Sequence, residues 1–259
     1  MDPSGAAVPL IVLVIGSFGL VIGSFLNVVI CRVPRGESIA YPPSHCPNCG
    51  HRLTAVELIP VFSYLIQGGR CRNCNAPISW QYPVVEILTA VLLILVYQTF
   101  GYTGTALYYA ALACILIVAA FTDLNHQIIP DKVILAGLVI GAALELAFRP
   151  RPPADNLYGL LLAGGLLLAA SAVTLGGMGG GDVKLAALLG FYLGWRGALL
   201  ALFLGFVAGA AAGLCLILLK IRGRKDFIPF GPFLALGGMV ATLWGPRIIE
   251  WYIAYALGR

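Results

Sequence analysis

The sequence predicts an all-α, polytopic membrane protein of about eight transmembrane helices, with a small cysteine-containing loop domain between the first two. Of the 259 residues, 60% are hydrophobic and only 10% are charged, whereas a soluble domain has about 25% charged residues. The apolar residues also fall into runs long enough to span a bilayer. The net charge of +5 does not indicate nucleic-acid binding, because the basic residues form no single block and are better explained as topology signals.

The apolar runs are separated by one long polar segment and several short ones. The runs cover residues 8–30, 83–100, 104–121, 132–148, 157–175, 183–195, 197–219 and 231–246. The tail, 247–257, either extends the last helix or lies at the membrane interface. We therefore expect three parts: a first transmembrane helix at 1–30, a loop domain at 31–82, and a seven-helix membrane domain at 83–259.

The basic residues predict the orientation in the membrane. Eleven of the sixteen Lys and Arg residues fall in the polar segments 31–82, 122–132, 176–184 and 220–227, which alternate along the chain and so share one side. Because Lys and Arg are enriched in cytoplasmic loops, this side is predicted to be cytoplasmic and both termini to lie outside. Asp123 and Asp182 are then predicted to lie on the cytoplasmic side. This result is independent of the orientation argument, which counted only Lys and Arg residues.

Four cysteines in the loop domain have the spacing of a metal site. Cys46 and Cys49 form one C-x2-C pair, and Cys71 and Cys74 form a second pair 21 residues further on. Two such turns can supply a tetrahedral shell of four sulfurs, which suits a structural zinc ion. Two disulfides, an iron–sulfur centre and metal-free thiols are the alternatives, and a reduced cytoplasm disfavours the disulfides. A closed shell leaves no open position for catalysis.

Three of the eleven acids lie beside apolar runs on the predicted cytoplasmic side: Asp123, Asp131 and Asp182. An acid at membrane depth is costly and is functional by default. Asp131 is explained by its place in the first turn of a helix. The structural explanations for the other two are a helix end that reaches water, for Asp123, and an N-cap, for Asp182.

Two carboxyl groups on one side of a helical bundle predict an aspartyl dyad formed by Asp123 and Asp182. When two carboxyls share a site, one is ionised and the other keeps its proton. The ionised group can activate water for attack on a peptide carbonyl, while the protonated group donates to the developing oxyanion. The pair therefore predicts peptide hydrolysis without a covalent intermediate.

A run of glycines precedes Asp182. Gly179 and Gly181 lack a Cβ atom, so we expect backbone of positive φ there and a close approach by a substrate strand. Phosphate binding is a poorer explanation, because the run lacks the G-x-x-x-x-G-K-[ST] pattern and no strand precedes it. Close packing of helices through small residues would explain the glycines but not the acid.

Five segments together resemble a known family. They are GSFLNVVICRVPRGES (23–38), the cysteine segment CPNCG…ELIPVFSYLIQGGRCRNC…ISWQYPVVE, TDLNHQIIPD (122–131), GMGGGDVKLAALLGFYLGW (177–195) and IPFGPFLALGG (228–238). In this order they resemble the type IV prepilin peptidases, which are membrane aspartyl proteases of the GxGD class. The resemblance covers nearly the whole chain and implies that Asp123 and Asp182 are the catalytic residues.

The resemblance also implies a substrate, cofactors and a location. The substrate would be the short basic leader of a type IV prepilin or a secretion pseudopilin, cut after a Gly on the cytoplasmic side of the bacterial inner membrane. The new N-terminal residue would then be methylated with S-adenosylmethionine. Gly69 and Arg70 match a Gly and a basic residue that the family links to methyl transfer, although Arg stands where Lys is expected.

A proton- or metal-coupled transporter is the alternative from another functional class. It would use intramembrane acids as relays near the bilayer midplane, together with paired broken helices. The acids of this chain cluster at one face instead. The peptidase is therefore the favoured hypothesis.

Overall fold

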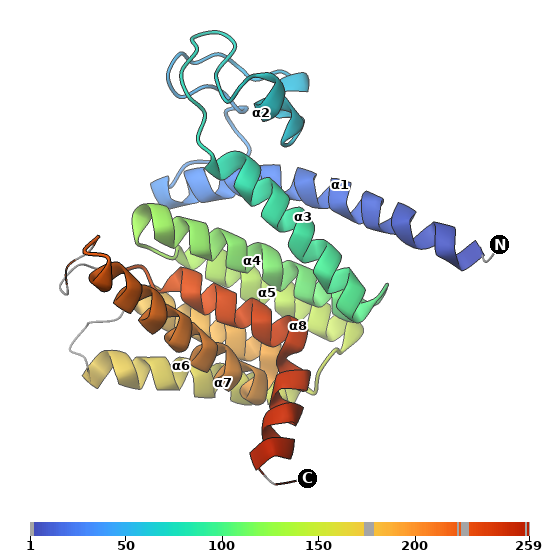
Figure 1. Ribbon diagram of the computed structural model, residues 1–259, viewed down its shortest axis with the longest axis vertical. Coiled ribbons are helices and arrows are strands. Elements are labelled where there is room, and N and C mark those ends of the chain that lie inside the picture. Colours follow the sequence, from blue (N-terminus) through green and yellow to red (C-terminus); the bar gives the residue numbers. More distant parts are fainter. Residues whose placement is uncertain (1–2, 174–178, 222, 224–227, 257, 259) are drawn as a thin grey trace. The chain divides into compact units, whose positions relative to one another are not determined.

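The computed structural model describes residues 3–173, 179–221, 223, 228–256 and 258, and it has helices but no strand in those ranges (Figure 1). The helices are α1 (Pro3–Arg32), α2 (Phe62–Ile66), α3 (Gln81–Phe100), α4 (Gly104–His126), α5 (Asp131–Phe148), α6 (Pro153–Val173), α7 (Gly180–Leu218) and α8 (Gly231–Ala256), with short 3₁₀ turns at Val33–Arg35 and Val56–Leu58. The all-α prediction is confirmed.

Six of the described helices are long and apolar enough to cross a membrane, namely α1, α3, α4, α6, α7 and α8. The 39-residue α7 is interrupted at Gly194, where φ is +66°, so it accounts for two predicted runs, 183–195 and 197–219. The predicted run 132–148 coincides with α5, whose 18 residues include three charged ones. Each predicted run thus lies in a helix, except that Leu219 follows the end of α7 and residues 174–175 fall outside the described part of the chain. The tail continues α8 as far as Ala256.

The chain divides into two compact units, residues 1–101 and 102–259. In the first unit, α1 and α3 pack through small residues. A Cβ atom at Gly19 would lie 2.6 Å from Cα of Ala90, and one at Gly23 would lie 2.6 Å from Cα of Glu86. Such a close approach needs glycine. The loop domain leaves the end of this pair and carries the short helix α2 (Figure 1).

The second unit is a bundle of α4 to α8, in which the helices lie side by side (Figure 1). The backbones of α6 and α7 touch at Gly159 and Gly190, where a Cβ on either glycine would overlap the carbonyl of the other. Tyr192 is fully buried and donates its hydroxyl to the carbonyl of Gly137 at 2.9 Å. This contact joins α7 to α5.

Candidate active site and metal-binding loop

Asp123 lies in the last turn of α4 and is 5% exposed. Its Oδ2 atom accepts a hydrogen bond of 2.8 Å from the backbone N–H of Gly231, which is the first residue of α8. The helix end that carries Asp123 therefore does not leave its carboxyl group in solvent. The structure instead ties that group to the beginning of another helix, 108 positions away.

Asp182 is the third residue of α7 and is 6% exposed. The N-cap of this helix is Gly179, so the alternative in which Asp182 serves as the N-cap is wrong. A carboxyl group in the first turn of a helix is favoured by the helix dipole. The charge of Asp123 acts on the Asp182 carboxyl group, so the two acids that the sequence paired lie in the same part of the bundle.

The glycines before Asp182 differ from expectation in one respect. Gly179 has a φ of −66°, and Gly181 lies within the regular first turn of α7, so neither has the expected positive φ. The reason is that α7 begins at Gly180, immediately after an extended N-cap. A Cβ atom on Gly181 would lie 3.0 Å from Cβ of Ile129, so this glycine admits a neighbouring segment of the same chain. Residues 176–178 of the glycine run lie outside the described residues.

Asp131 has a different environment from the two buried acids. It is the first residue of α5, as expected for an acid that complements a helix dipole. Its Oδ1 atom lies 2.6 Å from Nζ of Lys184, and the two side chains are 73% and 51% exposed. The predicted structural role is consistent with this exposed ion pair, which also gives Lys184 a partner.

The four predicted cysteine ligands converge in the loop domain. All four sulfur atoms lie within 4.8 Å of one another, with 3.8 Å between those of Cys46 and Cys74 and 4.0 Å between those of Cys49 and Cys71. All four cysteines are free in the structure, and both separations are far longer than the about 2.05 Å of a disulfide. Sulfurs at 2.3 Å from a tetrahedral zinc ion would be about 3.8 Å apart. The cluster therefore has the geometry of a metal site.

Hydrogen-bond donors surround these sulfurs. The side-chain amide of Asn73 donates to the Cys49 sulfur at 3.5 Å, and that of Asn48 donates to the Cys74 sulfur at 3.6 Å. The Asn73 side chain and the His51 amide lower the pKa of the Cys49 thiol. Donors of this kind favour thiolate, which is the metal-binding form of cysteine.

Gly69 and Arg70 lie directly before the second cysteine pair. Gly69 has a φ of +66°, and a Cβ atom there would lie 2.9 Å from the hydroxyl oxygen of Tyr64. Both features favour glycine. The side chain of Arg70 is exposed, and its backbone forms an isolated bridge with Pro77. The structure thus places these two residues beside the cluster, on the rim of the loop.

Glu57 is a buried acid of the loop domain whose contacts the sequence did not indicate. Its Oε2 atom accepts hydrogen bonds from the Thr54 amide at 2.9 Å and from the Thr54 hydroxyl at 2.8 Å. These bonds, with a third from His51, hold the pKa of Glu57 below its usual range. Glu57 therefore fixes the 3₁₀ turn that follows the first cysteine pair.

Comparison with known proteins identifies the family. Residues 17–100 match the Bacterial Peptidase A24 N-terminal domain, and residues 110–214 match the Type IV leader peptidase family. Relatives named prepilin leader peptidase/N-methyltransferase include those of Bacillus subtilis, 39% identical over 245 residues (93% of this chain, 97% of the relative), and Pseudomonas aeruginosa, 34% identical over 268 residues (92% of each).

The chain belongs to the type IV leader peptidase family. A relative from Aeromonas hydrophila is similar to the same extent, at 39% identity over 266 residues and 91% of each chain. No solved structure matches the chain significantly. The resemblance drawn from the five sequence segments is therefore confirmed.

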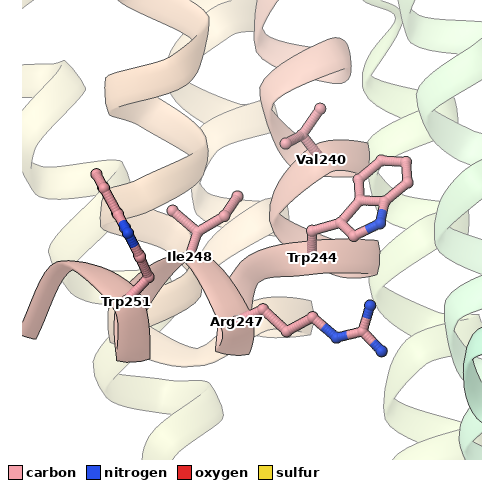
Figure 2. A pocket seen from close by; sticks show the side chains of 5 residues that line it. All are labelled: Val240, Trp244, Arg247, Ile248 and Trp251. Carbon is pink, nitrogen blue, oxygen red and sulfur yellow. The ribbon is translucent and has the colours of Figure 1, made fainter. Parts of the chain in front are cut away.

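Two pockets lie on the second unit of this leader peptidase family member, and neither Asp123 nor Asp182 lines them. One, of about 400 Å³, is lined by residues of the bent end of α8 alone, among them Trp244, Arg247 and Trp251 (Figure 2). Tryptophan and arginine side chains of this kind are typical of a membrane interface. The other, of about 300 Å³, is lined in part by Phe206 and Phe230. Its lining thus reaches the residue before Gly231, at the end of α8 that meets Asp123.

Proposed function

We propose that the chain removes the short basic leader of type IV prepilins or secretion pseudopilins, cutting after a Gly, and then methylates the new N-terminal amine. The observation that carries the proposal is a pair of buried acids, Asp123 and Asp182, which influence each other electrostatically within the segment that matches the Type IV leader peptidase family. The names of the relatives support both activities.

Cleavage uses the two acids as a pair that shares one proton, because like charges in one site cannot both ionise at low cost. The ionised carboxyl accepts a proton from water as the water oxygen attacks the scissile carbonyl carbon. The protonated carboxyl gives its proton to the carbonyl oxygen. The C–N bond of the tetrahedral intermediate then breaks, the amine takes a proton from one carboxyl, and a hydroxyl of the intermediate returns a proton to the other. No bond to the enzyme forms.

The four-cysteine cluster is proposed to hold a structural zinc ion. Cys46, Cys49, Cys71 and Cys74 supply four sulfurs at tetrahedral separations and have amide donors around them. Such a closed shell stabilises the fold of a small domain and leaves the metal no open position. Metal analysis of the purified protein should find about one zinc ion per chain and no stoichiometric iron. A protein that is folded and active without metal would contradict this part of the proposal.

Methyl transfer is assigned to the loop domain. S-adenosylmethionine would supply the methyl group to the free amine that cleavage releases. Gly69 and Arg70 lie beside the cysteine cluster, where the exposed Arg70 side chain can contact a substrate or a cofactor carboxylate. The loop and the acid-bearing helices lie in different compact units, which supports a division of the two reactions between them.

The enzyme is proposed to lie in the bacterial inner membrane, with the loop domain and both acids on the cytoplasmic side and both termini outside. The bias of Lys and Arg supports this orientation, as does a substrate whose basic leader is cytoplasmic. The six membrane-capable helices support a multi-pass protein. The domain division 1–30, 31–82 and 83–259 remains a prediction based on these functions.

A proton- or metal-coupled transporter is less well supported. Its relay acids would lie near the bilayer midplane, whereas Asp123 and Asp182 lie at helix ends and interact with each other. The direct test is to incubate membranes that contain the protein with a prepilin and follow leader removal by mass spectrometry. Cleavage by the wild type that is lost with either Asp123→Asn or Asp182→Asn supports the peptidase. Cleavage by both variants would overturn the dyad.

A further inference from the structure

We infer that Gly231 is a positioning residue for peptide cleavage, because its backbone N–H holds the carboxyl group of Asp123. This inference rests on the proposed function of Asp123 and adds to it a residue on a third helix. The N–H of Gly231 lies 2.8 Å from Oδ2 of Asp123. Both groups are buried, so the bond is not in competition with bulk water.

The sequence around the start of α8 leaves one donor free for Asp123. The first amides of a helix have no partner within that helix. Here Pro232 has no N–H, and the amides of Phe233 and Leu234 both donate to the carbonyl of Phe230 at 3.0 and 3.1 Å. The amide of Gly231 remains, and Asp123 accepts it. In the segment Phe230–Gly231–Pro232, the amide of Gly231 is thus the hydrogen-bond donor to Asp123.

The hydrogen bond distinguishes the two oxygen atoms of Asp123. Oδ2 accepts a proton from an amide, and an amide N–H can only donate, so the proton that the two acids share does not lie on this atom along the bond. This bond occupies one of the two lone pairs of Oδ2, whereas Oδ1 accepts no such backbone bond from the described residues, so we assign the exchange of a proton with water to Oδ1. The helix N-terminus therefore selects one face of the carboxyl group for the reaction.

A side chain at position 231 would be pressed against the carboxyl group of Asp123. A Cβ atom there would lie 2.8 Å from Oδ2, 3.1 Å from Cβ and 3.2 Å from Cγ of Asp123. Even alanine would therefore displace the carboxyl group. The same faces of α4 and α8 also meet two helical turns away. There Gly238, seven residues after Gly231, packs on Leu116, seven residues before Asp123. Two antiparallel helices thus hold the hydrogen bond at a fixed register.

The test is Gly231→Ala, with Gly245→Ala in the same helix as a matched control. A Cβ at position 245 meets only Leu200 and Ala241, at 3.7 and 4.0 Å, which are ordinary contacts. A displacement of a catalytic group by about 1 Å costs on the order of 100-fold in rate. We expect Gly231→Ala to lower kcat about 10- to 100-fold with KM changed less than about threefold, and Gly245→Ala to leave both unchanged. A folded Gly231→Ala protein with wild-type kcat would overturn the inference.

Two further measurements keep the inference testable. Asp123→Asn is assayed in parallel, because a variant that still cleaves would refute the proposed dyad and not the role of Gly231 alone. Thermal unfolding in detergent reports whether the bundle that contains Gly231→Ala has folded. If it has not folded, hydrogen exchange at the Gly231 amide tests the hydrogen bond to Asp123 instead. Exchange at this amide should be about tenfold faster or more in Asp123→Ala than in wild type. Equal exchange in the two proteins would overturn the inference.

Discussion

The cysteine loop and the acid site are built in opposite ways. The four cysteines come from two short turns within residues 46–74, and the spacing inside each turn brings their sulfurs together. The acid site takes Asp123 from the end of α4, Asp182 from the start of α7 and Gly231 from the start of α8. The loop site therefore depends on local backbone geometry, whereas the acid site depends on the packing of three helices.

The two regions also differ in the solvent exposure of their functional side chains. In the loop, Cys49 is exposed and Arg70 lies on the surface. In the bundle, Asp123 and Asp182 are 5% and 6% exposed. A metal-held loop can change shape locally without disturbing the helices of the other unit, whereas a buried pair of acids depends on the packing of its whole bundle. Damage to each region should therefore affect a different reaction.

The largest effect is expected from the acids. Asp182→Asn keeps the size of the side chain but removes its ability to exchange a proton, and general acid–base catalysis contributes about 10²- to 10⁴-fold. We expect leader removal to fall by at least this factor, and Asp123→Asn to do the same. Methyl transfer to a peptide that already lacks its leader should persist. Loss of both reactions in a folded variant would show that the two regions are not separate.

Removal of the metal should give the reverse pattern. Cys71 is one of the two buried ligands, and Cys71→Ser takes one sulfur from the cluster. Because structural zinc contributes about 10–16 kcal/mol to small domains at pH 7, we expect bound metal to be lost, the loop to become sensitive to protease, and methyl transfer to fail. Cys114→Ser, in α4, is the control for loss of a thiol. A Cys71→Ser protein that retains stoichiometric zinc would contradict the four-sulfur site.

The helix contact beneath the acid site should affect stability more than chemistry. Gly159→Ala would force a methyl group against the carbonyl of Gly190, and overpacking of this kind costs about 1–3 kcal/mol. Thermal unfolding in detergent should show this loss, with rate per folded molecule unchanged. Gly165→Ala in the same helix meets no atom within 4 Å and should not destabilise. Equal stability of the two variants would mean that α6 and α7 do not touch at Gly159.

The smallest effect is expected at the exposed ion pair. Asp131→Asn removes the partner of Lys184, and exposed pairs of this kind contribute about 0–1 kcal/mol. Leader removal should stay within about threefold of wild type, because screening by solvent and salt leaves little to lose. A loss of leader removal comparable to that of Asp123→Asn would show that Asp131 belongs to the active site. It would contradict the distinction between the buried and the exposed acids.

Much of this architecture follows from sequence, for identifiable physical reasons. Apolar runs of about 20 residues are helical in a membrane, because a helix pairs every backbone group within its own segment, and the C-x2-C spacing alone predicts two sulfur-bearing turns. Asp131 could be set apart from Asp123 because it follows Pro130 at a helix start. Each of these inferences uses neighbours along the chain.

The remaining features depend on contacts between distant segments. The bond from Gly231 to Asp123 spans 108 positions, and only the packing of α8 on α4 creates it, although the FGPF segment was already part of the resemblance. The expected positive φ at Gly179 was wrong because α7 starts one residue later and takes an ordinary extended N-cap. The burial of Glu57 likewise follows from the folded loop, since in the sequence it is one acid among several polar residues.

One experiment tests the separation of the two sites most directly. Asp182→Asn is incubated with labelled S-adenosylmethionine and either an intact prepilin or the same protein without its leader, and both leader loss and methyl incorporation are measured. We predict no leader loss and no methylation with the intact substrate, and wild-type methylation of the substrate that lacks its leader. Leader removal by the variant, or loss of methylation of the cleaved substrate by a folded variant, would contradict the account.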